Sequence, residues 1–434
     1  MRSSSAMDAA GDGSEFEVLN GATVQSPVAG GPPVLRWSAR THTLEGIEAE
    51  LARIWAGTSL TAPGEDGGLE RRVAARTSVL NLVVIARQPE LGERAGAVIG
   101  MLTGRHPSRT LIVSSADPDG PSWLDASVQA QCALPREGAA ETCAEFIHLV
   151  AGGETGRHLA AIVAPLLIHD LPVTLWWPGD PPLGSRQALD LLDMADRLVV
   201  DGSAWSGDGL DRLRALAGVV DDHDLSGGAL SVSDFAMLRQ SRWREAIASS
   251  FDRPELRPFL RHLVAITVRY AAREGSGAGE TNVIKPLYHV AWLASRLGLS
   301  VVTPLRSVAG IDDPHPGGGR RDHPADALGC ELRAGRRRVG ATLRPTHSRV
   351  PAGTTLTVEL AARRHDETLG IVVSAEAEAV IVRTTLNGRE LPARRFMAPR
   401  RTEVELLAET IDSVGRDPVA IAALRAAAEL AGPK

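Results

Sequence analysis

Short apolar runs alternate with amphipathic stretches from about Trp37 to Gly218, and this alternation constrains the fold more than any other feature of the sequence. Each run is rich in β-branched or aliphatic residues, as expected for strands buried on both faces of a sheet. Strands that alternate with helices of this length predict an α/β layer architecture with a mostly parallel sheet. The runs are Val79 to Ala86, Thr110 to Ser114, Cys143 to Val150, Val173 to Trp177 and Leu198 to Val200.

One of the intervening stretches predicts a single helix from Thr155 to Ile168. Its apolar residues recur at helical spacing and fall in one stripe, and Thr155 is a suitable N-cap.

The composition of the chain changes several times, and these changes predict its domain organisation. Residues 1–33 are rich in Ser, Gly, Ala and Asp and predict a disordered tail. Residues 34–220 form the predicted α/β domain. Residues 221–233 are polar and without period, which predicts a linker, and 234–434 form an α+β domain whose segment 327–401 is β-rich and basic.

Local signals within the second half predict its elements. Asp234 to Ser250 has a helical pattern, and a second helix is expected from about Val283 to Leu297, with Asn282 as its cap and Gly298 as its left-handed terminator. The pair Asn387-Gly388 between alternating runs predicts a two-residue β-hairpin. Asp417-Pro418 predicts the start of a final helix.

The sequence predicts a soluble, cytoplasmic protein that does not enter a membrane. The first residues lack the apolar stretch of a signal peptide, and the most apolar run, Leu159 to Trp177, is interrupted by Pro165, His169, Asp170 and Pro172. The three cysteines are scattered and form neither a disulfide framework nor a zinc motif. A reducing compartment fits this usage. The three cysteines are Cys132, Cys143 and Cys330.

No recognisable catalytic or cofactor motif occurs, so we expect no enzymatic activity, cofactor or metal. The turn from Gly152 to Arg157 leaves two interpretations open, an anion site or a glycine turn that lets a strand and a helix pack closely. His158 and His169 are eleven residues apart, about 16 Å along a helix, which is too far for one metal ion. The acid- and histidine-containing loop Asp312 to Asp326 predicts a solvated, irregular segment.

Lysine is almost absent from the chain, because 45 of the 47 basic residues are arginine. Lys285 is one of the two lysines and lies within a predicted helix, with His289 and Trp292 on the same face. Either this position requires an ammonium group rather than a guanidinium, or the lysine is incidental.

Charge is distributed unevenly along the chain, whose net charge is −6. Ala327 to Arg401 contains 14 arginines and 7 acidic residues. Such a segment can bind nucleic-acid phosphates, but it has one aromatic residue, Phe396, and so lacks a platform for stacking bases. A basic face for an acidic protein partner is the more economical interpretation.

Several motifs resemble the glucose-6-phosphate dehydrogenase assembly protein family, OpcA. They are Arg105 to Arg109, the run His158 to Asp180, the pair Asp234-Phe235 with Arg239, and Trp243 to Glu245. The resemblance implies a non-catalytic protein that binds glucose-6-phosphate dehydrogenase, supports its assembly or activates it allosterically, and so promotes the oxidative pentose phosphate pathway and NADPH formation. Some members of the family are redox-responsive through paired cysteines, and the separated cysteines here give no sign of such a pair.

Six residues form the predicted partner or ligand surface: Arg105, His106, Arg109, Trp176, Trp177 and Lys285. The two tryptophans come at the end of a predicted parallel strand, where open α/β sheets carry ligand sites, and they must face opposite sides of the sheet. The alternative is that both rings lie in the core and that the arginines pair with carboxylates. Two other functions remain open: a phosphosugar-binding enzyme or sensor that uses the Gly152 turn and Arg105, and a nucleic-acid-binding protein.

Overall fold

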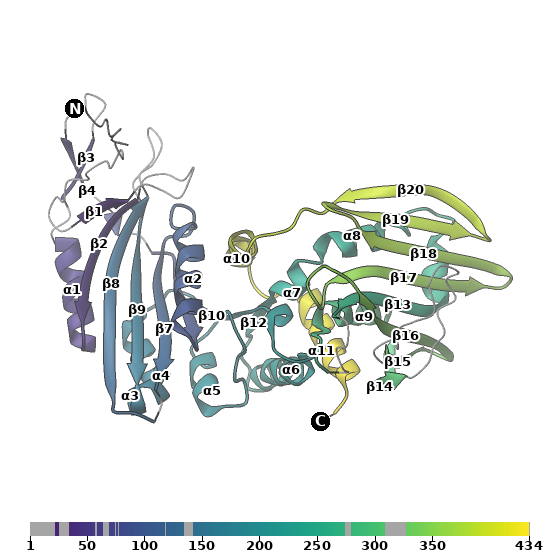
Figure 1. Cartoon of the computed structure of the whole chain (residues 1–434), viewed down its shortest axis with the longest axis horizontal. Coiled ribbons are helices and arrows are strands. Elements are labelled where there is room, and N and C mark those ends of the chain that lie inside the picture. Colours follow the sequence, from purple (N-terminus) through teal and green to yellow (C-terminus); the bar gives the residue numbers. More distant parts are fainter. Residues whose placement is uncertain are drawn as a thin grey trace, which may run out of the picture.

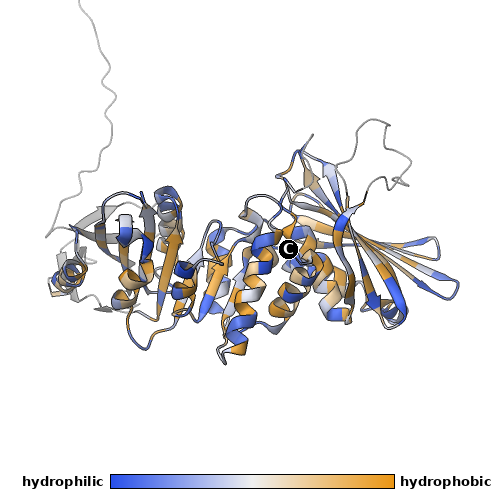
Figure 2. Ribbon diagram, turned by 90° about the horizontal axis from the view of Figure 1, so that it is seen from below, coloured by the Kyte–Doolittle hydropathy of each residue, from blue (hydrophilic) through white to orange (hydrophobic). Residues whose placement is uncertain are grey.

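Two large β-sheets lie at opposite ends of an elongated molecule, and helices fill the space between them (Figures 1 and 2). The computed structural model describes residues 22–25, 34–56, 59–63, 69–73, 75–76, 78–117, 119–133, 142–273, 279–308 and 327–433. The predicted loop 312–326 lies outside the described residues, and so does the predicted tail 1–33 apart from strand β1 (Ala22–Gln25).

The first sheet has a parallel centre that is extended by antiparallel strands on one side. The parallel strands, in spatial order, are β9 (Thr142–Gly152), β7 (Ser108–Ala116), β6 (Leu80–Ala86), β10 (Val173–Trp177), β11 (Arg197–Val200) and β12 (Ser231–Asp234). Beyond β9 lie the antiparallel strands β8 (Trp123–Ala133), β2 (Val34–Thr41) and β1. Two short additions are β5 (Ala75–Arg76), which pairs with β9, and the hairpin of β3 (Ser59–Pro63) and β4 (Leu69–Val73).

The α/β prediction is confirmed, and the reason is visible in the burial of the strands. Every residue of β6 is buried, because helices cover both faces of the sheet. One face packs against α1 (Leu44–Ala56), α4 (Leu159–Val163), α5 (Arg186–Leu192) and α6 (Leu210–Leu225). The other face packs against α2 (Pro89–Gly100) and a helix from the far end of the chain, described below.

The single helix predicted from Thr155 to Ile168 is wrong. The segment contains α3 (Gly153–Arg157), α4 and one 3₁₀ turn (Ala164–Leu166). His158 leaves the helical region with φ −116° and ψ 50°, and Pro165 lacks the N–H that would continue an α-helix. The apolar stripe is nevertheless buried as predicted, with Leu159, Ile162, Val163 and Leu166 in the core.

The irregular linker predicted at 221–233 is also wrong in its local structure. Helix α6 continues to Leu225, and β12 then pairs with β11 as a further parallel strand of the first sheet. Polar residues dominate this segment because α6 exposes one side to solvent and because β12 is the last strand of the sheet.

The second sheet contains eight strands and is antiparallel except for the pair β13–β16. Its spatial order is β14 (Ser300–Val308), β15 (Ala327–Ala334), β16 (Arg337–His347), β13 (Leu263–Ala272), β17 (Thr355–Arg364), β18 (Glu367–Ala375), β19 (Ala379–Leu386) and β20 (Arg389–Met397). The predicted hairpin is confirmed, because Asn387 and Gly388 join β19 to β20 with φ values of 52° and 77°. The α+β prediction for this half is confirmed as well.

Most helices of the second half lie on one face of this sheet. The predicted helical segment from Asp234 divides into α7 (Phe235–Leu238) and α8 (Ser241–Ser249). Helix α9 (Ile284–Leu297) ends at Gly298, whose φ of 63° confirms the left-handed terminator. Helix α11 (Pro418–Ala431) begins as predicted, with the Asp417 side chain accepting a hydrogen bond from the Val419 N–H at 2.8 Å.

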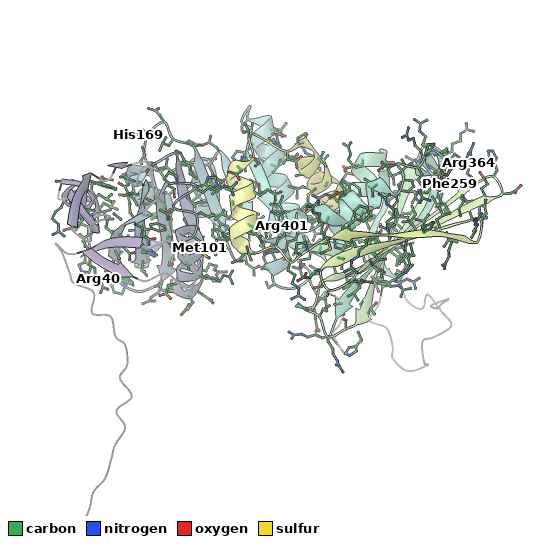
Figure 3. The ribbon with its side chains drawn as sticks, turned by 90° about the horizontal axis from the view of Figure 1, so that it is seen from above. Arg40, Met101, His169, Phe259, Arg364 and Arg401 are labelled. Carbon is green, nitrogen blue, oxygen red and sulfur yellow. The ribbon has the colours of Figure 1, made fainter. Side chains whose placement is uncertain are left out.

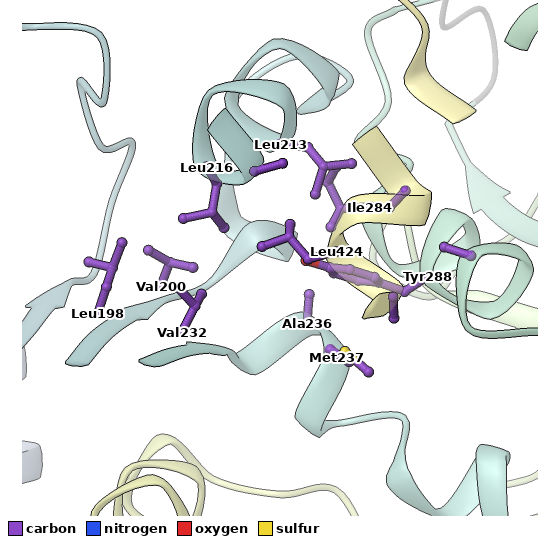
Figure 4. Close-up of a cluster of buried hydrophobic side chains, with 14 of the residues drawn as sticks. Leu198, Val200, Leu213, Leu216, Val232, Ala236, Met237, Ile284, Tyr288 and Leu424 are labelled. Carbon is purple, nitrogen blue, oxygen red and sulfur yellow. The ribbon is translucent and has the colours of Figure 1, made fainter. Parts of the chain in front are cut away.

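One hydrophobic cluster joins the two halves of the molecule. Leu198 and Val232 of the first sheet pack with Leu216 of α6, and the cluster continues through Tyr288 of α9 and Leu424 of α11 (Figure 4). The same cluster extends into the buried face of the second sheet. The boundary between the halves is therefore a packed core.

Helix α10 (Glu403–Asp412) returns from the second sheet to cover the first. Thr402 and Glu405 form a capping box that fixes its beginning. Its residues Leu406 and Leu407 are fully buried beside the side chains of β6 and α2. Arg197 of β11 also donates to the Ser413 carbonyl at 2.7 Å, just beyond the end of the helix.

Replacing Leu406 tests this packing. Leu406→Ala is expected to lower the free energy of unfolding by about 2–5 kcal/mol, because a fully buried leucine leaves a cavity between α10 and the first sheet. Urea denaturation followed by tryptophan fluorescence measures the change. Leu189→Ala, at an exposed leucine of α5, is the control and is expected to cost about 0.5 kcal/mol or less. An equal effect of both variants contradicts the role given to α10.

Candidate functional site

Arg109 is an internal structural residue of the first sheet. It lies on β7 with its side chain 4% exposed, and its Nε donates to Glu145 Oε2 at 2.6 Å. Its Nη1 donates to Glu48 Oε1 at 3.0 Å and to the Leu166 carbonyl at 2.9 Å. Glu145 also accepts a hydrogen bond from Trp55 Nε1 at 2.7 Å. This is the carboxylate pairing that the sequence left open as the alternative.

Arg105 and His106 contact the end of α10. Asp412 forms an ion pair with the exposed Arg105, and the second carboxylate oxygen lies 3.2 Å from His106 Nε2. Burial lowers the pKa of His106, Asp412 opposes this shift and Arg105 adds to it. These two residues therefore help to hold the returning helix against the first sheet.

Trp176 and Trp177 face opposite sides of β10, as predicted, and both are buried. Trp176 packs near the Phe235 ring with centroids 6.1 Å apart, whereas Trp177 belongs to the cluster on the other face. Their exposed fractions are 1% and 3%. Most of their surface is consequently used by the core.

The six predicted residues do not form one surface. Arg109 is opposite Asn81 at the start of β6, whereas Trp176 is opposite Val84 near its end, and β6, β7 and β10 run parallel. Trp177 consequently lies about 13 Å further along the sheet than Arg109. The prediction that the arginines and Trp177 share one edge is wrong, because Arg105 precedes β7 and Arg109 is near its start, whereas Trp177 is the last residue of β10.

A cavity of about 560 Å³ does occur at the carboxyl ends of β6 and β10. The chain proceeds from β6 towards β7 on one side and from β10 towards β11 on the other, so this is the point where the strand order reverses. Open α/β sheets bind ligands at such points. Trp177, Arg87, Arg94 and Asp180 are among its lining residues. Asp180 accepts from Ser206 and Arg212, and Arg94 is 3.3 Å from Glu403.

Lys285 lies elsewhere, on the first turn of α9, and lines a different cavity. His289, one turn further, is fully buried against the Trp243 ring with centroids 5.4 Å apart. Burial, together with a smaller contribution from Arg244, lowers the pKa of His289 to about 3. The sequence predicts that Lys285 and His289 lie on one face of a helix. In the structure their surroundings differ, because Lys285 lines a cavity and His289 lies in the core.

The basic segment 327–401 forms most of the second sheet, and register defines its two faces. Leu343, Val268, Val358 and Val373 are directly opposite one another and buried beneath the helices. The next row, one residue along, lies on the other face and is polar except for Ile381: Arg344, Arg269, Thr357, Ser374, Ile381 and Arg395. We call this second face the open sheet face.

The open sheet face carries arginines at its surface. Arg338 and Arg383 share this face by strand alternation, and both residues are exposed. Arg338 is 3.1 Å from Glu331, and Arg269 donates to Glu359 at 2.9 Å. The aromatic residue of the segment, Phe396, is half-buried, and the Arg394 guanidinium lies 5.1 Å from its ring centroid.

The Gly152 turn has the geometry of close packing. Gly153 has φ +55°, and a Cβ there would lie 2.6 Å from backbone atoms of Gly120 and Pro121. The helix that follows has five residues, and Glu154 at its start pairs with His158 at 2.8 Å. The interpretation as a packing turn is thus supported by the surrounding contacts. His169 lies on the outer surface of the molecule (Figure 3).

The expectation of unpaired cysteines is wrong. Cys143 is disulfide-bonded, and strand register places Cys132 of β8 directly opposite it. Cys330 is free and buried. The two cysteines are eleven residues apart in sequence, and only the antiparallel pairing of β8 with β9 brings their backbones together.

Among the described residues, no group of three or more His, Cys, Asp or Glu side chains could hold a metal ion. None of the helices in that part of the chain is long and apolar enough to cross a membrane.

Asp234 is a buried carboxyl group that connects three segments near Lys285. Its Oδ1 accepts from the N–H groups of Gly202 and Ala236 at 2.8 Å each, and its Oδ2 accepts from Tyr288 Oη at 2.8 Å. Burial and, to a smaller extent, the nearby Asp201 carboxylate raise the pKa of Asp234, the three hydrogen bonds oppose the shift, and the resulting pKa is about 6. The protonated form is thus favoured more in the folded than in the unfolded chain.

Removal of the Arg109 side chain is expected to destabilise the protein strongly. Arg109→Ala removes a guanidinium from the fully buried Glu145 carboxylate, and losing one partner of a buried pair costs about 3–5 kcal/mol. Urea denaturation at neutral pH measures this loss. Arg157→Ala, which removes an exposed arginine paired with Asp119, is the control and is expected to cost at most about 1 kcal/mol. A loss no greater than that of the control contradicts the assignment.

Asp234 is expected to make stability fall with rising pH. Its contribution is full below the unfolded pKa of 3.8 and is lost as the pH rises through about 6. Asp234→Asn retains a similar shape without titrating, so the free energy of unfolding of the variant relative to the wild type should rise by about 2.4 kcal/mol between pH 4 and 7. Asp252→Asn at an exposed carboxylate controls for the charge change. A pH-independent difference between Asp234→Asn and the wild type contradicts the assignment.

The chain matches two family models that cover most of its length. Residues 100–217 match the glucose-6-phosphate dehydrogenase subunit N-terminal domain, and residues 230–424 match the C-terminal domain of the same subunit. An OxPP cycle protein OpcA of Synechocystis is 25% identical over 189 residues, which are 43% of this chain and 36% of that protein. The matched part is thus less than two thirds of the relative.

Solved structures show only distant similarity. The transcriptional regulator Gal80p of Kluyveromyces lactis is 9% identical with a TM-score of 0.42, over 82% of this chain and 88% of that chain. The 3-ketoreductase KijD10 of Actinomadura kijaniata is 12% identical with a TM-score of 0.41, over 81% and 96%. The two consecutive family matches, in contrast, agree with the motifs at Arg105, at His158 to Asp180 and at Asp234. The chain therefore belongs to the OpcA family of glucose-6-phosphate dehydrogenase subunits.

Proposed function

We propose that the protein binds glucose-6-phosphate dehydrogenase and promotes its assembly or activity without catalysing a reaction itself. The observation that carries this proposal is the match of both halves of the chain to the two domains of a glucose-6-phosphate dehydrogenase subunit. The relative named as an OxPP cycle protein supports the same pathway. The effect on the cell would be more flux into the oxidative pentose phosphate pathway and more NADPH.

Activation of this kind requires only a difference in affinity. A partner that binds the competent state of an enzyme more tightly than the incompetent state shifts the population towards the competent state. About 1.4 kcal/mol of differential binding gives a tenfold shift. No catalytic group is needed in the partner.

The open sheet face is the surface that we assign to the dehydrogenase. The helices α8 and α9 cover the other face of the same sheet, whereas Arg338 and Arg383 on the open sheet face are exposed. Its exposed Arg338 and Arg383 favour an acidic surface on the partner. The buried Arg109, Trp176 and Trp177 have little surface to offer a partner.

Mixing the purified chain with the dehydrogenase of the same organism tests the proposal. We expect the two proteins to co-elute from a size-exclusion column and the specific activity of the dehydrogenase to rise. The double variant Arg338→Glu/Arg383→Glu should weaken the association at least tenfold, and this loss should be larger at low salt.

Arg186→Glu provides the matched control, because it reverses an exposed charge on α5, far from the open sheet face. It should leave the association unchanged. Wild-type protein that neither co-elutes nor changes the activity contradicts the function, whereas normal association of the double variant contradicts only the surface.

A further inference from the structure

A cavity of about 610 Å³ lies where α8, the first turn of α9 and the ends of strands β17, β18 and β19 meet. This volume falls within the range of small-molecule sites. The segment that leads into α10 closes one side of it, and Figure 3 labels Arg401 beside that helix. Five cationic side chains contribute to the lining: Arg239, Arg242, Lys285, Arg400 and Arg401.

Most of the lining charges already have partners. Glu376, an acidic residue of the lining, is 3.1 Å from Arg395 on the open sheet face. Three of the five cations pair with carboxylates as Arg239–Asp201, Arg242–Glu245 and Arg401–Glu409. Lys285 and Arg400 have no ion-pair partner among the described residues. Two positive charges consequently remain for an anion in the cavity.

The environment of Lys285 disfavours an uncompensated cation. Burial lowers the pKa of its amine and Arg239 lowers it further, whereas Asp201 and Asp234 raise it. Asp201 is already engaged by Arg239 at 2.7 Å, and Asp234 accepts hydrogen bonds from its own partners. A bound anion would supply the negative charge beside Lys285 that Asp201 and Asp234 do not provide.

Two further features of the lining indicate a recessed site with specificity. Thr355 is 5% exposed, and its hydroxyl has no hydrogen-bond partner among the described residues. Gln240 is also buried, and its amide is fixed by a 2.6 Å hydrogen bond to the Lys285 carbonyl. The Trp243 ring, held from behind by His289, adds a flat apolar wall. Most buried polar groups in proteins have a hydrogen-bond partner, so the Thr355 hydroxyl is available to a polar group of a ligand in this cavity.

We propose that this cavity binds a small phosphorylated metabolite, with its phosphate group at Lys285 and Arg400. A phosphate monoester carries about −1.5 to −2 charge at neutral pH, which matches the two unpaired cations. The Thr355 hydroxyl would bond a polar group of the ligand, and the Trp243 ring would contact its organic part. Arg400 and Arg401 precede Thr402, the N-cap of α10, so the ligand would also stabilise the segment that links the two sheets.

Binding to the full chain alone, without the dehydrogenase, tests this site separately from the proposed function. Isothermal titration calorimetry and thermal unfolding are measured with glucose 6-phosphate, a nucleoside diphosphate and inorganic phosphate. We expect saturable binding and a raised Tm with at least one of the two organic phosphates. Lys285→Met should weaken that binding at least tenfold, Lys285→Arg less, and Thr355→Val severalfold.

Arg400→Ala is a second test in case the Lys285 variants misfold. Because it removes an exposed cation, the loss of affinity expected for this variant does not depend on the packing of the core. Arg186→Met is the control outside the cavity and should bind as the wild type does. Several results overturn the proposal: binding of neither organic phosphate, equal affinity in wild type and Lys285→Met, or inorganic phosphate binding as tightly as the organic phosphates. Occupation of the cavity only by an acidic peptide would overturn it as well.

Discussion

The return of α10 to the first sheet is the contact on which the arrangement of the whole chain depends. Helix α10 follows the eight strands of the second sheet in the chain. Its residues Leu406 and Leu407 complete the hydrophobic layer over β6 and Trp176, which α2 alone would leave incomplete. The first half therefore cannot bury both faces of its parallel sheet without residues from the last tenth of the chain. On the opposite face, the largest cluster extends continuously into α9 and α11, which fixes the second sheet against the first.

Features that depend on local sequence could be predicted. The apolar runs at Val173 and Leu198 form strands, because continuous β-branched and aliphatic residues suit a sheet that is covered on both faces. Asn387-Gly388 forms its hairpin because both residues tolerate positive φ, and Asp417-Pro418 starts its helix because the cap and the fixed φ act within one turn. In each case the local sequence is sufficient to indicate the type of element, although the strands still need distant partners to pair with.

Features that depend on distant pairing could not be predicted. An arginine is usually expected at the surface. Only the register of β7 with β9 places Glu145 beside Arg109. The same register argument separates Arg109 from Trp177, since a sequence without strand order does not tell which end of a sheet a residue occupies. The cysteine pair was missed for the same reason, and β12 was missed because its polar residues suit the last strand of a sheet as well as a linker.

Lys285 shows how a weak compositional signal and a structural one can reinforce each other. The rarity of lysine indicated only that arginine had not replaced it, whereas the structure places Lys285 in the lining of a cavity. A guanidinium is larger and holds its donors in a fixed fork, while an ammonium group is compact and directs three donors. The cavity also includes Arg400 and Arg401, which begin the segment that carries α10 to the first sheet. A ligand held by Lys285 and Arg400 would thus bear on the same contact that joins the two halves, so occupancy of the cavity and the docking of α10 are expected to stabilise each other.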